Sequence, residues 1–128
     1  YSERRVRDLG ADLLQTYFEK LDKERYRVSK LLRKRVCFTP MNIMAITKKS
    51  LGRMDIIFCQ NLLIYFDRGR RYQIVDALAE HLVPGGLLIL GSGELVHWGH
   101  PAMQKLNTLG TLVFQRHQAA GDKTRQIL

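Results

Sequence analysis

Two neighbouring carboxamides, Gln60 and Asn61, interrupt an otherwise apolar run of the sequence. A third, Asn42, precedes Ile43 after an earlier apolar segment, and Tyr65 follows four residues after Asn61. Carboxamides donate and accept hydrogen bonds, so they can contact a polar, neutral ligand edge such as a nucleobase or an amino-acid group. The alternative for Asn42 and Asn61 is a cap or a turn residue, and the alternative for Tyr65 is a core aromatic.

Three predicted strands would place these polar residues at one edge of a sheet. The strands cover residues 35–41, 54–59 and 87–90, and polar residues follow each of them: Asn42, then Gln60-Asn61, then the sequence GSGE that ends at Glu94. The last two strands are almost wholly apolar, which is typical of parallel strands covered on both faces. Ligands of open α/β sheets bind at the carboxyl ends of such strands.

The remaining elements follow from periodicity and turn residues. An amphipathic helix over residues 70–82, ended by Pro84-Gly85-Gly86, joins the last two strands into a βαβ unit. We expect a helix over residues 4–21 that Gly10 can break, and a short strand over residues 26–28. Residues 103–108 and 111–116 flank Leu109-Gly110 and predict a terminal hairpin.

Composition limits the class of protein. The chain of 128 residues suits one domain, and it has no apolar run long enough to span a membrane. Its two cysteines, Cys37 and Cys59, lie in apolar runs and are expected to be buried free thiols. The formal charge of +9 is uneven, since residues 1–53 hold 14 Lys and Arg against 6 Asp and Glu. This basic part could face nucleic acid or an acidic protein surface, although it offers no stacking platform of aromatic residues.

The block "MDIIFCQNLLIYFDR", then a helix, then "LVPGGLLILGSGE", resembles the CheR-type chemotaxis methyltransferases, with a PilK-like relative as a subtype. The stretches "YSERRVRDL", "LLQTYFEK", "VCFTPMNIM" and "TLGTLVFQR" are similar to the same family, so the resemblance covers roughly residues 1–116. It implies an α/β chain with a partial Rossmann-like S-adenosylmethionine-dependent methyltransferase fold. That fold would lack its first two strands and end in a β-hairpin.

The resemblance also implies a function and a site. Members of the family methylate glutamate side chains of methyl-accepting chemoreceptors with S-adenosylmethionine and release S-adenosylhomocysteine. By position, Asn42, Ile43, Gln60 and Asn61 match cofactor contacts, and Tyr65 matches a catalytic tyrosine near the transferred methyl group. We expect a cytoplasmic protein with a chemoreceptor as partner, no nucleic acid and no membrane insertion.

The resemblance further implies a domain layout. Residues 1–117 would form the C-terminal portion of the methyltransferase domain, residues 22–34 its small inserted β-subdomain, and residues 118–128 a flexible tail. No glycine-rich loop occurs in the subdomain region, so we expect no docking of a receptor tail there. The two missing strands would pair between the strands at residues 35–41 and 54–59. We therefore expect the chain to be inactive on its own, and to form an edge-paired or strand-exchanged homodimer.

Two departures from the family's pattern leave alternatives open. Gln60 stands where the family has arginine, and Ser92 stands where it has histidine. One alternative is a non-catalytic regulatory module that keeps the methyltransferase fold, and another is a basic nucleic-acid-binding domain. His97 and His100 lie near Glu94, but no third nitrogen or sulfur ligand is near them in sequence, so we expect no metal site.

Overall fold

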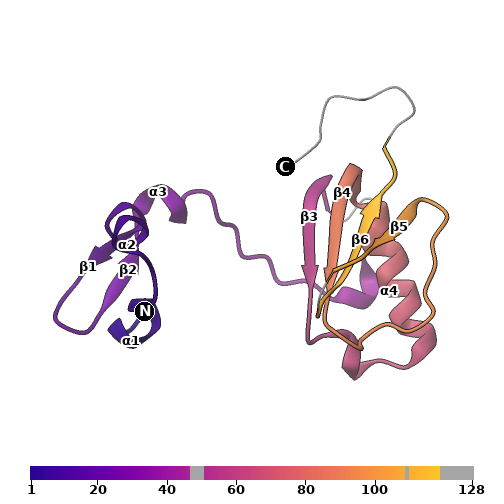
Figure 1. The fold of residues 1–128 in the computed structure, drawn as a ribbon, viewed down its shortest axis with the longest axis horizontal. Helices are drawn as coiled ribbons and strands as arrows, with labels where there is room; N and C mark the ends of the chain where they lie inside the picture. Colours follow the sequence, from indigo (N-terminus) through magenta and orange to yellow (C-terminus); the bar gives the residue numbers. More distant parts are fainter. Residues whose placement is uncertain (47–50, 109, 119–128) are drawn as a thin grey trace. The chain divides into compact units, whose positions relative to one another are not determined.

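The computed structural model describes residues 1–46, 51–108 and 110–118 (Figure 1). The chain separates into two compact units, Tyr1–Pro40 and Met41–Leu128, and each is described by itself. The predicted tail lies, apart from residue 118, outside the described residues. The domain boundaries drawn from the sequence therefore stay a prediction.

The first unit is a small α+β module around a two-stranded antiparallel sheet. Its strands pair from Phe18↔Val28 to Lys20↔Tyr26, and Val6 is its buried residue. The predicted helix over residues 4–21 is broken before Gly10 and again at Phe18, where the chain turns into a strand. The strand predicted over residues 26–28 is confirmed. The elements are α1 (Glu3–Val6), α2 (Ala11–Tyr17), β1 (Phe18–Lys20), β2 (Tyr26–Val28) and α3 (Lys30–Arg33).

The second unit is built on a mixed sheet of four strands in the order β3-β4-β6-β5. The two pairings of β4 differ in direction, since β3 and β4 are parallel while β4 and β6 are antiparallel. β5 and β6 form the predicted terminal hairpin. The α/β class, the parallel pair and the hairpin are therefore confirmed. The strands are β3 (Met54–Cys59), β4 (Leu82–Leu90), β5 (Met103–Leu106) and β6 (Leu112–Arg116).

Helix α4 (Arg68–Glu80) connects β3 to β4 and packs on one face of the sheet (Figure 1). It begins at Asp67, whose Oδ1 accepts a hydrogen bond from the Arg70 N–H at 2.9 Å. Its buried side chains recur at spacings of three and four residues, as the sequence predicted: Ile74, Val75, Leu78 and Ala79. The helix starts two residues earlier and ends two residues earlier than expected, because Leu82 already belongs to β4.

The Pro84-Gly85-Gly86 sequence forms an irregularity inside β4 rather than a turn before it. Met54 pairs with Leu82 and Ile56 already pairs with Leu87, so residues 83–86 bulge out of register. A Cβ on Gly86 would lie 2.9 Å from the Val83 carbonyl oxygen, so only glycine fits this close backbone approach. Regular pairing then runs from Leu87 to Leu90, which is the strand that the sequence predicted.

The strand predicted over residues 35–41 is wrong. None of these residues, all of which are described, belongs to a strand, and Phe38 is 94% exposed. The segment has apolar and β-branched residues, but a strand exists only where a neighbour supplies its hydrogen bonds, and no strand of the described residues pairs with it. Cys37 is for the same reason exposed rather than buried, whereas Cys59 is buried as expected, and both are free thiols.

The outer edge of the sheet is β3, which has a neighbour on only one side within the described part of the chain. Its alternate residues Ile56 and Phe58 are 48% and 69% exposed on the face opposite α4, whereas Ile57 and Cys59 are buried. Among the described residues, no helix combines the length and the apolarity that are needed to cross a bilayer.

Candidate functional site

The carboxyl ends of β3 and β4 lie at the same edge of the sheet because the two strands are parallel and Cys59 pairs with Leu90. Gln60 and Asn61 follow the first strand, and Gly91 follows the second. β6 runs antiparallel to β4, and its pairing of Leu112 with Leu90 brings the β5–β6 loop to this edge too. The fold thus gathers at one edge the polar residues that the sequence placed at strand ends.

A cavity of about 280 Å³ lies beside the end of β3. Two of the predicted cofactor residues, Ile43 and Gln60, line it together. The rest of its lining is apolar: Met41, Ile46, Leu51, Met54, Ile57, Phe58, Cys59, Leu62 and Leu78. An apolar cleft with a single carboxamide at its rim suits a flat heterocycle that needs one or two hydrogen bonds. Sequence reasoning did not identify most of this lining, because apolar residues carry no signal that separates a pocket from a core.

Asn42 lies at the start of the short 3₁₀ helix η1 (Ile43–Ala45). Its Oδ1 accepts a hydrogen bond from the Met44 N–H at 3.0 Å. The capping role that the sequence offered as an alternative is therefore present, and it holds the adjacent Ile43 in place at the cavity. The amide nitrogen of Asn42 has no hydrogen-bond partner among the described residues, so it can still donate to a ligand.

Asn61 adopts a left-handed backbone conformation, with φ at +58°. Asparagine tolerates this region better than most residues, so the turn role that was the alternative is also present. The residue is exposed, and within the described part of the chain its carboxamide makes no hydrogen bond. A left-handed residue directly after a strand turns the chain sharply, so it presents the side chains of Gln60 and Asn61 at the sheet edge.

Tyr65 closes the 3₁₀ helix η2 (Leu63–Tyr65), between the end of β3 and the start of α4. Its side chain is 77% exposed, so the alternative reading as a core aromatic is wrong. The same short helix buries Leu63 completely. The buried leucine anchors the loop, while the tyrosine side chain stays exposed.

Glu94 holds the loops after the two parallel strands together, and sequence reasoning missed this role. Only 3% of the residue is exposed. One oxygen accepts hydrogen bonds from the N–H groups of Leu62 and Leu63 at 3.0 and 3.1 Å, and the other accepts from the Gly91 N–H at 2.7 Å. A Cβ on Gly91 would collide with this carboxylate, which explains the glycine. The signal in the sequence was the acidic residue three positions after a strand-ending glycine.

The thiol of Cys59 faces this buried charge. Burial first, and then the negative charge of Glu94, raise the pKa of Cys59 to about 11. The thiol therefore stays protonated at neutral pH and cannot act as a nucleophile, although it lines the cavity. Its role is that of a small apolar residue in the cavity wall.

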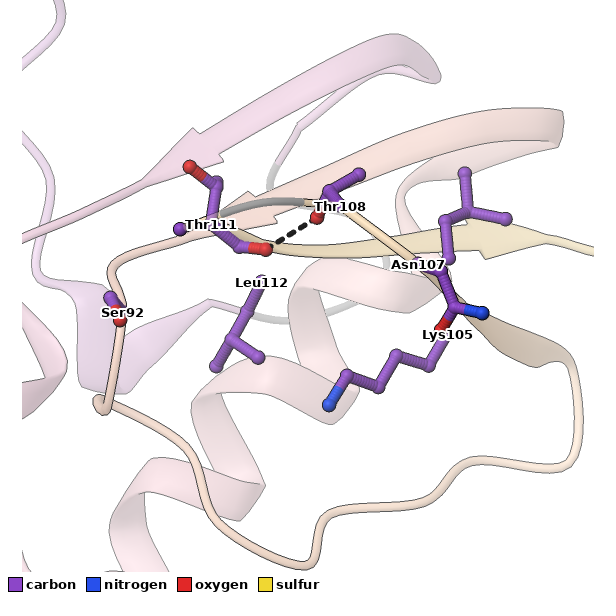
Figure 2. A pocket seen from close by; sticks show the side chains of 8 residues that line it. Ser92, Lys105, Asn107, Thr108, Thr111 and Leu112 are labelled. Atoms are coloured by element: carbon purple, nitrogen blue, oxygen red, sulfur yellow. Dashed lines mark hydrogen bonds between the residues drawn. The ribbon is translucent and has the colours of Figure 1, made fainter.

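A second, more polar cavity of about 370 Å³ lies at the same edge of the sheet, between Ser92 and the β5–β6 loop (Figure 2). Figure 2 shows Lys105 and Asn107 beside the loop, where the Thr108 hydroxyl donates a hydrogen bond to the Thr111 carbonyl at 2.5 Å. Ser92 thus belongs to a polar wall separate from the apolar cavity. Among the described residues, no three His, Cys, Asp or Glu side chains converge as a metal site.

The geometry fits part of a nucleoside cofactor such as S-adenosylmethionine. The apolar cavity can take the base, and its volume lies just below the ~300 Å³ at which pockets for whole ligands begin. Tyr65 lies at the end of the short helix that follows β3. The amino-acid and ribose ends of the cofactor would need further residues, since neither a G-x-G-x-x-G loop nor an acidic strand end occurs in this sequence.

Comparison with known proteins gives a consistent result. The family model described as "CheR methyltransferase, SAM binding domain" matches residues 1–111. Chemotaxis protein methyltransferase 2 of Vibrio cholerae serotype O1 is 40% identical over 95 residues, which are 73% of this chain and 33% of that protein. Chemotaxis protein methyltransferase 1 of Pseudomonas aeruginosa is 36% identical over 91 residues, 71% of this chain and 33% of that protein.

The chain thus spans about a third of the length of the curated relatives it matches. Among solved structures, an O-methyltransferase family protein from Burkholderia thailandensis aligns with a TM-score of 0.49 and 16% identity. That alignment covers 71% of this chain and 38% of the other.

Proposed function

This chain belongs to the CheR methyltransferase family, and we propose that it carries the C-terminal part of a domain that methylates glutamate side chains of chemoreceptors. The description of the matching domain names a methyltransferase that binds S-adenosylmethionine, which is the methyl donor in this proposal. The observation that carries the proposal is the apolar cavity at the carboxyl end of β3, with Ile43 and Gln60 in its lining. The sequence predicts both residues as cofactor contacts.

The reaction asks for positioning rather than for acid–base chemistry. A glutamate side chain has a pKa near 4.3, so at pH 7 it is already an anionic nucleophile. S-adenosylmethionine supplies a methyl group on a sulfonium cation. The protein has to hold the carboxylate oxygen in line with that methyl group at about 3–3.5 Å and exclude water.

Four of the five predicted site residues have a task in this scheme. Ile43 and the cavity wall would hold the base, while Gln60 and Asn61 would hydrogen-bond to polar groups of the cofactor. The exposed Tyr65 hydroxyl would donate a hydrogen bond to the acceptor carboxylate and orient it. Glu94 positions the loop that carries Tyr65 through the N–H groups of Leu62 and Leu63, and touches no reactant.

Calorimetric titration of S-adenosylmethionine and S-adenosylhomocysteine into this chain tests the site. We expect weak binding, in the millimolar range, because the cavity holds only part of the cofactor. Gln60→Ala and Asn61→Gly should each weaken it about fivefold, the effect of one lost hydrogen bond. Glycine is chosen at position 61 because it keeps the left-handed backbone. The exposed Gln15→Ala in α2 is the matched control. Equal affinities for all variants would contradict the proposed site.

A non-catalytic regulatory role is the second candidate. Two departures from the family's sequence pattern favour this role: Gln60 stands in place of an arginine, and Ser92 stands in place of a histidine. A methyl-transfer assay with radiolabelled S-adenosylmethionine and chemoreceptor, run on the longest form of the protein, separates the two. Cofactor binding without methyl transfer, unchanged when arginine is restored by Gln60→Arg, would favour the regulatory role.

We also propose that two copies of this chain pair through the outer edge of β3. The support is the position of β3 at the end of the sheet and the exposure of Ile56 and Phe58 on its open face. An open apolar edge is a template for pairing with another strand. A second copy offers such a strand.

A further inference from the structure

A third cavity, of about 270 Å³, lies at the beginning of α4 and is distinct from the cavity beside β3. It is formed between the first turns of the helix and the segment that follows Gly93. Two arginines of the helix face it from one side, and a histidine faces it from the other. Its lining residues are Arg68, Arg71, Tyr72, Glu94, Leu95, Val96 and His97.

Both guanidinium groups are fixed by neutral partners. Arg68 Nε donates to the Tyr72 hydroxyl at 3.0 Å, and its guanidinium lies 5.4 Å from the centre of the tyrosine ring. The tyrosine hydroxyl in turn donates to the Val96 carbonyl oxygen at 2.7 Å. Arg71 donates to the carbonyl oxygens of Phe66 and Glu94 at 2.7 and 3.2 Å. Within the described part of the chain, neither arginine forms an ion pair with a carboxylate.

The lining also contains one carboxylate, that of Glu94, which offsets one of the two positive charges. Both oxygens of Glu94 are occupied by backbone N–H groups, those of Leu62, Leu63 and Gly91. His97 has a left-handed backbone, with φ at +57°. Such a conformation is uncommon for a residue other than glycine and recurs where a loop clamps a ligand. The lining therefore holds two guanidinium groups, one carboxylate and an imidazole, a net formal charge of +1 with the histidine counted as neutral, and the carboxylate oxygens are already occupied by backbone donors.

We propose that this cavity binds a carboxylate side chain of the acceptor protein, next to the glutamate that receives the methyl group. The inference rests on the proposed function. The cavity is tied to the reaction site through Arg71, which holds the carbonyl of Phe66, the residue that directly follows Tyr65. Guanidinium groups that are already oriented pair well with carboxylates, because their fork of N–H donors matches the two oxygens. An acceptor segment with two acidic residues close together would thus be selected over one with a single acidic residue.

Fluorescence anisotropy with a labelled peptide rich in glutamate and alanine tests the proposal. Arg68→Gln removes one positive charge from the cavity lining. Arg70→Gln is the control, because it also removes one positive charge, but from an exposed arginine that does not line the cavity and pairs with Asp67 at 3.4 Å. We expect Arg68→Gln to weaken peptide binding about three- to tenfold, and Arg70→Gln less than twofold. Arg68→Lys should keep part of the affinity. Equal effects of Arg68→Gln and Arg70→Gln would overturn the proposal.

Two further experiments are needed. The first separates a protein side chain from free glutamate as the source of the carboxylate, and the second separates the hypothesis of the carboxylate cavity from the proposed methyltransferase function. A peptide with every glutamate replaced by glutamine should bind equally to the wild type and to Arg68→Gln. Free glutamate should compete only weakly with the labelled glutamate peptide. Preferential capture of free glutamate would overturn the assignment to a protein side chain. Calorimetry should give the same affinity for S-adenosylmethionine in Arg68→Gln and in Arg70→Gln. Peptide binding that depends on Arg68, in a chain that binds no cofactor, would uphold the pocket and reject the proposed function.

Discussion

Glu94 holds together the two loops that form the candidate site. Its three hydrogen bonds satisfy N–H donors from the loops after β3 and β4, which lie in different parts of the sequence. A carboxylate that accepts several backbone N–H groups makes stronger bonds than a neutral side chain, and these bonds are shielded from water. The positions of Leu62, Leu63 and hence Tyr65 depend on this one side chain.

Replacement of Glu94 by glutamine should therefore destabilise the second unit. The amide can accept from one loop but places its NH₂ group against an N–H donor of the other, at a cost of about 1.5–3 kcal/mol. The measurement is urea unfolding monitored by the fluorescence of Trp98, the single tryptophan. Its ring packs edge-on against that of Phe114 in this unit, with 4.8 Å between the ring centres. Lys105→Gln also removes one charge, but at an exposed position, and should change the unfolding free energy by less than about 0.5 kcal/mol. Equal stability of the two variants would contradict the role assigned to Glu94.

Single residues could be read from the sequence only where their neighbours in space are also neighbours in sequence. Gln60, Asn61 and Tyr65 stand directly after an obvious strand, so their placement at its end followed from the apolar run alone. The bonds of Glu94 span 31 and 32 residues to Leu63 and Leu62, and no local pattern announces them. The burial predicted for Cys37 is wrong for the same reason, because burial depends on what packs against a segment.

The helix α4 was the most predictable element. Its buried residues follow the helical period, and Asp67 is a strong N-cap residue three positions before the N–H group that it binds. The strand at residues 35–41 was predicted from similar local signals and is absent. The difference is physical: a helix satisfies its backbone hydrogen bonds internally, whereas a strand needs a partner strand.

The cap of α4 gives a prediction at the scale of the element. Asp67→Ala should lower the unfolding free energy of the second unit by about 1 kcal/mol, because the Arg70 N–H loses its acceptor. Asp67→Asn keeps the cap but loses the exposed ion pair with Arg70, which contributes little. Urea unfolding, monitored by Trp98 fluorescence, should give Asp67→Asn an unfolding free energy close to that of the wild type. That of Asp67→Ala should lie clearly below both. An equal loss in the two variants would mean that the ion pair, rather than the cap, stabilises the helix start.

At the scale of the whole molecule, the open edge of β3 predicts self-association. Light scattering on a size-exclusion column at micromolar concentration should report twice the mass of one chain, or larger species. Ile56→Lys puts a charge on the exposed face of β3, where Ile56 is 48% accessible, and should shift the chain toward the monomer. Unchanged Trp98 fluorescence would show that the variant is folded. A wild type that elutes as a clean monomer would reject the proposed pairing.

The open edge of β3 can also pair with a strand of a different polypeptide, so that two chains together would form one sheet. β3 already has its regular partner β4 on one side, so a strand supplied by another molecule can extend the sheet without displacing any existing pair. The cavity beside β3 would gain a second wall in the same event. Cofactor affinity and association with the second piece would then be thermodynamically linked, and each would strengthen the other by the same factor. Association of two chains would then strengthen the weak cofactor binding that this chain has alone.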